Sequence, residues 1–488
     1  MKGDSSMDKV SDPLLPFLQN EHTQNIPENL RHVPNEILHQ GYSIVPGLFT
    51  PEECQHALDA MWNFVQDTSG HMVDKNDPHS WYPKNQLFPK EEENKSNIDG
   101  TCNESASNSG DGDGDGDGDG DGDAKSALSD DEDPWPHTGY SSFPDMFQSL
   151  GAGFLLGAER EIMAERVFEP LFGTKELHAS KEGFTFARPK TIISESGSSE
   201  AMSRKEYQWQ RPEQLQEVRV CGKPQKNNVG EHYEHYDQAH DTKGLHTIQS
   251  SVCFIDQKEE DGDGHFVCYP NSHSEVHNSV TKDIYRGRFS WVPLTSEEVQ
   301  SLAATAGEKE IKPLHIYAKA GDVILWRSDL IHAAVPPSCE TGNFRSVGYF
   351  SMTPASWTPS YPGVWKEKLD AYRFFKTGDH RAFEESWHDH KRKGQISDAS
   401  SLSEENWILL RQRPHYRLCP PIVTRRLAQL YGILPYGLSS EEMCKEVDRA
   451  TIRGVRFDGD EEVVPSQQGP LCTAKLQYIG ITGGASLP

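Results

Sequence analysis

The stretch HYEHYDQAHD, residues 232–241, holds three histidines and two aspartates. Within it, His235 and Asp237 stand two positions apart, and residues at this spacing on a β-strand project from the same face. An imidazole and a carboxylate placed in this way can bind one metal ion with little distortion of the backbone. We expect the rest of the fold to be arranged around this pair.

A third candidate ligand, His332, lies in the apolar, strand-prone segment KAGDVILWRSDLIHAAVPP, residues 319–337. Two histidines and one carboxylate on one face of a metal form the facial triad, which leaves the opposite coordination positions open. Non-heme Fe(II) oxygenases use this arrangement. The sequence therefore predicts an Fe(II) site made of His235, Asp237 and His332.

Arg345 follows His332 across the connection VPPSCETGNF, residues 335–344, whose prolines and Gly342-Asn343 pair predict a turn. If the flanking runs pair as antiparallel strands, about 4.8 Å apart, Arg345 lies beside His332 on the inward face. A guanidinium in that position is suited to holding a carboxylate through two parallel hydrogen bonds.

Composition places much of the negative charge in one segment. The chain has 488 residues and a net charge of −27, and residues 91–133 hold sixteen acids against two lysines. We expect residues 90–133 to form a disordered acidic Asp/Gly insert on the surface. The remainder is mildly acidic, which argues against nucleic acid as a partner.

The nine cysteines form no CxxC pair, which favours reduced thiols in an intracellular protein over a disulfide framework. The N-terminal residues lack the charged and apolar regions of a signal peptide, and no run of about 18 apolar residues predicts a membrane span. These features predict a cytoplasmic protein.

Helix signals come first in the chain. Residues 1–33 are polar and predict a disordered arm, and a short strand follows around Tyr42–Val45. Thr50 with Glu53 forms a capping box, which predicts a helix over residues 51–67. Residues 143–173 also have a helical pattern.

From residue 217 the hydrophobic period changes to two, and seven strand candidates follow without a helical segment between them. They are EVRVC (217–221), HYEHYDQ (232–238), LHTIQSSVCFIDQ (245–257), GHFVCYPNSH (264–273), HIYAKAGDVILW (315–326), LIHAAVPP (330–337) and RSVGYFSM (345–352). This pattern predicts a mainly β fold with flanking helices, either an antiparallel barrel or a double-sheet jelly roll. Helix signals return after Pro354.

Four segments, in this order, carry a resemblance to a known family. They are GYSIVPGLFTPEEC (41–54), HYDQ with HTIQSSVCFID (235–256), the hairpin EEDGDGHFVCYPNSH (259–273), and GDVILWRSDLIHAAVPP (321–337) followed by Arg345. Together they resemble the phytanoyl-CoA dioxygenase family of Fe(II)/2-oxoglutarate oxygenases.

The resemblance implies a double-stranded β-helix, the cupin-like form of the jelly roll, within a single domain over residues 34–440 and a C-terminal extension over 441–488. It also implies Fe(II) on His235, Asp237 and His332, with Arg345 holding 2-oxoglutarate. Such an enzyme uses O2 to hydroxylate or desaturate a small-molecule or lipid substrate, releasing succinate and CO2. Halogenases related to the family have a small residue in place of the carboxylate, whereas this chain retains Asp237.

Departures from the family pattern leave some positions open. The glycine of the family's PGSH turn is Asn271 here, which predicts a left-handed asparagine. Ala334 stands where a hydroxyl often contacts the cosubstrate, so the second cosubstrate contact is undetermined. Gln249 is predicted either to reach the cosubstrate or to pack in the sheet. The other histidines nearby are expected to be structural or to support the ligands; they are His232, His240, His246, His265 and His273.

Two other classes of protein fit part of the pattern. A zinc-dependent hydrolase would use the HxxHxD cluster, His232, His235 and Asp237, as its metal site. This assignment leaves His332 and Arg345 without a role. A catalytically silent jelly-roll binding protein would not need an intact triad. Formation of succinate in proportion to substrate turnover separates these alternatives from an oxygenase.

Deleting residues 91–133 is expected to leave the fold intact, because a long polar insertion costs little loop-closure entropy and buries no apolar surface. Thermal unfolding of the truncated protein should match that of the full chain. Insolubility of the truncated protein, or a large fall in its melting temperature, would show that the segment packs.

Overall fold

The computed structural model describes sixteen stretches of the chain, and all structural statements below concern these residues. They are 26–82, 134–136, 146–148, 151–189, 217–220, 223–226, 234–239, 245–282, 292–305, 311–335, 337, 343–358, 363–373, 377–378, 380–383 and 421–458. The predicted acidic insert and the arm before residue 26 lie outside these stretches.

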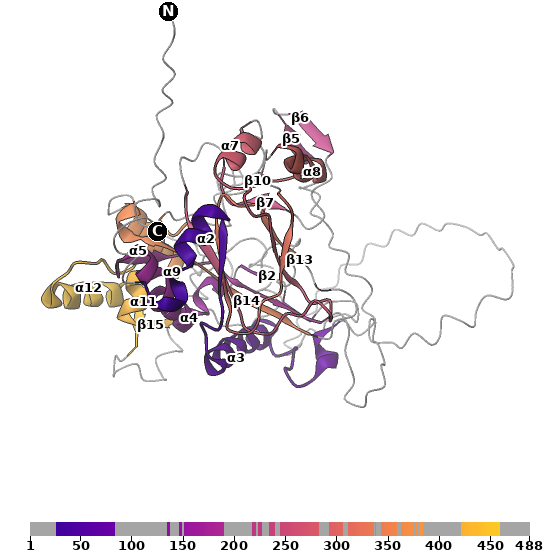
Figure 1. Cartoon of the computed structure of the whole chain (residues 1–488). Helices are drawn as coiled ribbons and strands as arrows, with labels where there is room; N and C mark the ends of the chain where they lie inside the picture. The colour runs from indigo at the N-terminus through magenta and orange to yellow at the C-terminus, as the bar shows by residue number, and fades with distance from the viewer. Residues whose placement is uncertain are drawn as a thin grey trace, which may run out of the picture.

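The larger of two main sheets contains seven strands (Figure 1). Its order is β1 (Tyr42–Val45), β12 (Val323–Arg327), β8 (Ile248–Cys253), β14 (Arg345–Pro354), β4 (Phe184–Ala187) and β2 (Met146–Phe147), and β3 (Leu177–Ala179) pairs with the end of β14. Every pairing in it is antiparallel. The sheet therefore joins the predicted strands 245–257 and 345–352 side by side.

The second sheet contains five short strands, all paired antiparallel. Its order is β10 (Val292–Pro293), β7 (His235–Tyr236), β13 (His332–Val335), β9 (His265–Cys268) and β11 (Leu314–Ile316). Along the chain, β7, β9, β11 and β13 belong to this sheet, whereas β8, β12 and β14 belong to the larger one. The chain thus crosses repeatedly between the sheets.

An apolar layer joins the two sheets. It includes Trp326 and Val347 from the larger sheet with Phe266 and Ile316 from the smaller one, all at most 6% exposed. The inward side chains of β14 are therefore Arg345, Val347, Tyr349 and Ser351, since alternate strand residues share a face. This inward face borders the predicted site.

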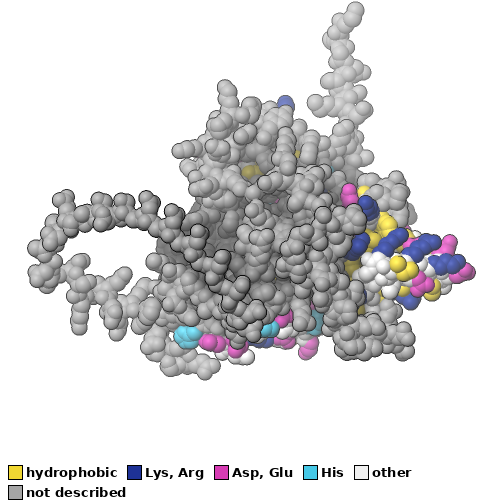
Figure 2. Space-filling model, turned by 180° about the vertical axis from the view of Figure 1, so that it is seen from behind, with side chains coloured by type: hydrophobic (Ala, Val, Ile, Leu, Met, Phe, Trp, Pro, Cys, Tyr) yellow, Lys and Arg dark blue, Asp and Glu magenta, His cyan; other side chains and the backbone are white. Residues whose placement is uncertain are grey.

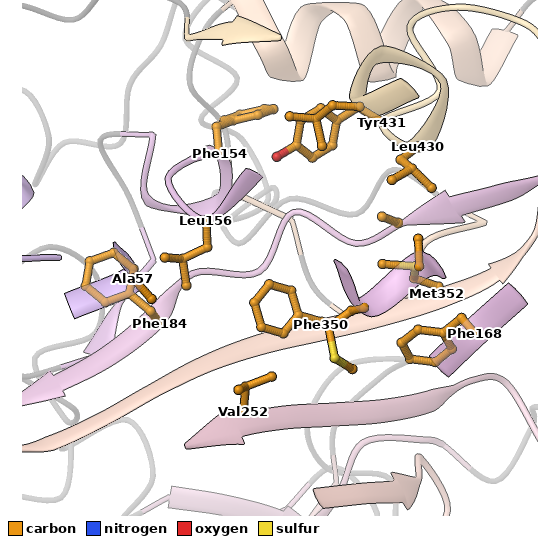
Figure 3. Packing of buried hydrophobic residues seen from close by; sticks show 14 of the residues in the cluster. Ala57, Phe154, Leu156, Phe168, Phe184, Val252, Phe350, Met352, Leu430 and Tyr431 are labelled. Atoms are coloured by element: carbon orange, nitrogen blue, oxygen red, sulfur yellow. The ribbon is translucent and has the colours of Figure 1, made fainter. Parts of the chain in front are cut away.

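The opposite face of the larger sheet is covered by helices. Phe184, Val252, Phe350 and Met352 pack there against helical residues such as Leu430 (Figure 3). The helices of this cluster are α2 (Val33–His39), α3 (Pro51–Thr68), α4 (Gly157–Met163) with a π-helical turn (Ala164–Phe168), α5 (Glu169–Phe172), α9 (Gly363–Arg373), α11 (Arg425–Leu430) and α12 (Ser440–Ile452).

The helix predicted over residues 51–67 is confirmed as α3. Its capping box forms as expected, with Thr50 Oγ1 accepting from the Glu53 backbone N–H and the Glu53 carboxylate accepting from the Thr50 N–H. Pro51 takes the first helical position, where its missing N–H costs no hydrogen bond.

The single helical segment predicted over 143–173 is wrong in its first part. Phe147 belongs to strand β2 and pairs with Phe184, and Gly151 adopts a left-handed φ of 84° that a helix excludes. Helix α4 begins only at Gly157. The predicted end is correct, since Gly173 closes α5 in the left-handed conformation, with φ 63°.

The expectation that no helix separates the strands is also wrong. Helix α7 (Glu275–Thr281) follows β9, and α8 (Ser296–Thr305) lies between β10 and β11. Strand β5 (Glu217–Val220) exists, but it pairs with β6 (Lys223–Lys226) in a separate hairpin. The period-two pattern identified strands without showing which sheet each one joins.

Strands β13 and β14 do not pair, so the predicted placement of Arg345 beside His332 is wrong. β13 pairs with β7 and β9, whereas β14 pairs with β8, β4 and β3. The connection after Val335 is long enough to carry the chain from one sheet to the other, which a tight hairpin would prevent. Arg345 thus faces the interior from the opposite sheet.

Both ends of the described chain extend the core. Ile26, Leu30 and Val33 are buried, so the expected arm is ordered from residue 26 onward. Strand β16 (Arg456–Phe457) pairs parallel with β15 (Ile422–Val423) and buries Phe457. Helix α12 projects at the side with mixed charges (Figures 1 and 2). None of the described helices is both long and apolar enough to cross a membrane.

Phe350→Ala is expected to lower the free energy of unfolding by about 3–5 kcal/mol, because Phe350 is fully buried between the larger sheet and its helices. Denaturant titration measures the change. Ile452→Ala removes a side chain that is 86% exposed and should stay within about 0.5 kcal/mol of the parent. Equal effects in both variants would contradict the assigned core.

Candidate metal centre

His235, Asp237 and His332 come together at one end of the second sheet. Each offers one ligand atom, and the three atoms lie within 4.8 Å of one another. His235 Nε2 is 3.7 Å from Asp237 Oδ1, and His332 Nε2 is 3.4 Å from Asp237 Oδ2. Neighbouring ligand atoms on a metal with bonds of about 2.1 Å are about 3 Å apart, so small side-chain adjustments could close this group on one ion.

Pairing between strands sets this arrangement. His332 opens β13 and lies directly across from His235 on β7, with ring centroids 4.4 Å apart. The His332 Nδ1–H donates to the Leu330 carbonyl, 3.0 Å away, which leaves the Nε2 lone pair directed at the group. A histidine held in this tautomer is prepared to bind a metal.

Asp237 is fixed by the turn that precedes His332. Its backbone N–H donates to the Ser328 carbonyl at 3.0 Å, and the Ser328 hydroxyl donates to Gln238 Oε1 at 2.8 Å. The same Gln238 oxygen accepts from the His246 backbone N–H. Ser328 thus links the residues after β7, the start of β8 and the turn into β13.

Gln249 supports the carboxylate from the larger sheet. Its Nε2 donates to Asp237 Oδ2 at 2.8 Å, whereas its buried Oε1 has no partner among the described residues. Burial acts to raise the pKa of Asp237, but His380, His235 and His332 outweigh it and hold that pKa well below its usual value. Asp237 therefore stays ionised. The predicted contact of Gln249 with a cosubstrate stays a prediction.

Arg345 enters the interior at the other end of the strands. Gly264 touches it, because a Cβ on Gly264 would lie 2.8 Å from Arg345 Cδ. Gly264 adjoins His265, which pairs with Val335 at the far end of β13 from His332, three residues or about 10 Å away. Arg345 is 7% exposed, and its Nε has no partner among the described residues.

Two residues near the centre were missed from the sequence. His380 is 4% exposed and places Nδ1 3.8 Å from Asp237 Oδ2. Glu182 lies just before β4, and its carboxylate is electrostatically coupled to both His380 and Asp237. Neither residue belongs to a spaced motif, and only the folded chain brings them to the ligands.

The other histidines have separate partners. His265 Nε2 is 2.8 Å from His315 Nδ1, and His273 Nε2 contacts the Leu38 carbonyl at 3.2 Å. Burial lowers the pKa of His246 to about 3. His232 and His240 lie outside the described residues, and so does the zinc cluster that needs His232. Asn271 has φ 67°, confirming the expected left-handed turn.

Comparisons with known proteins found similarity only among solved structures. No family model matches the chain, and no curated protein matches its sequence. EctD from S. alaskensis, solved with 2-oxoglutarate and 5-hydroxyectoine, has 14% identity and a TM-score of 0.36, covering 73% of this chain and 86% of that one.

Two further structures are similar at the same level. The non-heme alpha ketoglutarate dependent epimerase SnoN from nogalamycin biosynthesis has 12% identity and a TM-score of 0.31, covering 66% of this chain and 80% of its own. AviO1 from Streptomyces viridochromogenes Tue57 has 13% identity and a TM-score of 0.31, and the match covers 67% of this chain and 96% of AviO1. These scores are too low to transfer a fold or a function. What this chain does has to follow from its own side chains.

Asp237→Ala and His332→Ala are each expected to abolish Fe(II) binding, because the remaining two donors hold the ion too weakly. Anaerobic calorimetry with Fe(II) measures the affinity, and circular dichroism checks that each variant folds. His79→Ala removes an exposed histidine and should leave the affinity unchanged. Parental Fe(II) affinity in either ligand variant would refute the assigned site.

Proposed function

We propose that the protein is an Fe(II)- and 2-oxoglutarate-dependent dioxygenase that hydroxylates or desaturates a small molecule and releases succinate and CO2. His235, Asp237 and His332 would hold the iron, and Arg345 would hold the far carboxylate of 2-oxoglutarate. Of the observations, the one that carries the proposal furthest is the buried Arg345 on the same interior as the three ligands, whose Nε has no partner among the described residues.

The strand order supports a double-stranded β-helix as the scaffold. In such a fold, the chain alternates between two facing antiparallel sheets, and the ligands lie between them. The order β12-β8-β14-β4 facing β7-β13-β9-β11 has this alternation. The chain's resemblance to the phytanoyl-CoA dioxygenase family, over residues 41–345, belongs to this proposal, as does the single domain over residues 34–440.

The donor set fits iron. Two imidazoles and one carboxylate on one face suit non-heme Fe(II) and leave open positions for a chelating 2-oxoacid and O2. When bound, iron with 2-oxoglutarate would supply the oxidising power for attack on a C–H bond. Asp237 would occupy the position that a halide needs, which favours hydroxylation or desaturation over halogenation.

Arg345 fits the cosubstrate because a buried guanidinium with a polar atom left without a partner among the described residues is costly. A five-carbon diacid bound at the ligand end of β13 would direct its second carboxylate toward Arg345 at the far end. Tyr349 lies between them on the inward face of β14, and its hydroxyl is 2.9 Å from Thr185 Oγ1. This hydroxyl pair is our candidate for the second cosubstrate contact, in place of the missing hydroxyl at Ala334.

The surrounding side chains keep the ligands in place and exclude water. Trp326 and Phe266 flank the His332 ring, with centroids 5.3 and 5.9 Å away, and both are buried. Gln249 directs the Asp237 carboxylate through its amide. Apolar walls strengthen the electrostatic contacts of the charged groups that they enclose. A substrate would approach from the side where His380 and Glu182 lie.

Arg345→Lys is expected to raise the 2-oxoglutarate concentration needed for half-maximal turnover about ten- to a hundredfold. Lysine keeps the charge but loses the two parallel hydrogen bonds, a charge-assisted contact worth about 1.5–3 kcal/mol. Succinate formation measures the requirement. Fe(II) affinity should stay unchanged, because Arg345 is not a ligand.

Arg373→Lys on α9, whose side chain is 40% exposed, is the matched control and should behave as the parent. Unaltered 2-oxoglutarate dependence in Arg345→Lys would place the cosubstrate elsewhere. Loss of iron from that variant would make Arg345 a structural residue instead.

A further inference from the structure

Glu182 carries a carboxylate whose described hydrogen-bond partners are two hydroxyl groups. Its Oε2 accepts hydrogen bonds from the hydroxyls of Ser180 and Ser351, at 2.7 and 2.8 Å. It forms no ion pair with a lysine or arginine in the described part of the chain. Burial raises its pKa, and His380 opposes the shift. A carboxylate in this state is stabilised by an added cation.

This carboxylate is close to the proposed iron site through neighbouring strands. Ser351, which donates to Glu182, pairs directly with Gln249 across β14 and β8, and Gln249 holds Asp237. His380 acts on the pKa of both carboxyls. Glu182 therefore borders the space beside the ligands rather than the helical layer.

Short contacts also fix the backbone of this corner. The Ser180 N–H donates to the Ser351 carbonyl at 2.8 Å, and Arg160 donates to the Glu182 carbonyl at 3.2 Å. The Gly378 N–H donates to the Lys181 carbonyl at 3.0 Å, which ties the segment carrying His380 to the segment carrying Glu182. The two side chains are thus placed before any ligand binds.

The same corner contains buried polar atoms without a hydrogen-bond partner among the described residues. Gln249 Oε1, a hydrogen-bond acceptor, is one of them, and His380 Nε2 is another. Gln249 and His380 are each at most 4% exposed. A ligand with several donors matches the Glu182 carboxylate and the Gln249 oxygen together.

We propose that Glu182, with Gln249 beside it, binds a protonated amine on the substrate. An ammonium group offers three donors and no acceptor, whereas a hydroxyl offers one donor. An acyl chain offers none. The inference rests on the proposed function and names its substrate class as a small amine-bearing molecule rather than a lipid acyl group.

The test begins with the anaerobic protein loaded with Fe(II) and 2-oxoglutarate, whose charge-transfer absorption reports the assembled centre. The probes are primary amines and diamines, their matched alcohols and carboxylic acids of the same carbon skeleton, and an acyl thioester. Binding is read from the perturbation of the band, and succinate formation after O2 is added is a second readout. Amines are expected to bind at lower concentrations than the matched compounds.

Glu182→Gln should raise the concentration of amine needed for half-saturation at least about tenfold, because it keeps the shape and removes the charge. Glu182→Asp keeps the charge and should retain the amine preference. Glu176→Gln, at an exposed position on the same segment, is the matched control. In all three variants the charge-transfer band should persist, which shows that the centre is intact.

Preferential binding of alcohols, acids or the thioester would overturn the amine assignment. So would a panel in which no amine binds, or an amine affinity that Glu182→Gln leaves unchanged. Failure of the parent protein to develop the charge-transfer band is a different result, because it refutes the proposed function itself.

Discussion

The carboxylate of Asp237 is the group on which the interior depends. A carboxylate that is 16% exposed loses most of its hydration, and the surrounding chain has to replace it. Gln249, His235, His332 and His380 do so from four different segments of the chain. Removing the carboxylate would leave these groups facing one another without a common partner. The crossing of the chain between two sheets is what brings them to one place.

Because the ligand group and Arg345 lie toward opposite ends of the strands, a molecule that contacts both must lie along the interior. The apolar layer of Trp326, Phe266 and Val347 shields the space between the sheets from water. Electrostatic contacts at both ends therefore act in a medium of low dielectric constant, where they are stronger than in water. Gly264 contributes by having no side chain where Arg345 passes.

Local signals in the sequence predicted local structure well. The capping box at Thr50 correctly predicted the start of α3, and Gly173 correctly predicted the end of α5, because each signal depends on residues a few positions apart. The HxD spacing and His332 identified a group that the fold does assemble, since His235 and His332 lie on paired strands. The pattern alone leaves the order of the strands open.

The failures concern contacts between distant residues. The sequence contains nothing that assigns β13 and β14 to different sheets, so His332 and Arg345 were paired wrongly. His380 and Glu182 lie in segments without periodicity, and only tertiary packing brings them beside Asp237.

The pairing of β1 with β12 has a consequence for biosynthesis. Tyr42 is made early, yet its partner Trp326 leaves the ribosome only after most of the chain, and Phe457 completes the helical layer later still. The nascent N-terminal third therefore exposes an unpaired strand and apolar helix faces for much of translation, at about 5–20 residues per second. Chaperones that shield hydrophobic segments are expected to bind such a chain during synthesis. Its folding should also be slow, because its key contacts are remote in sequence.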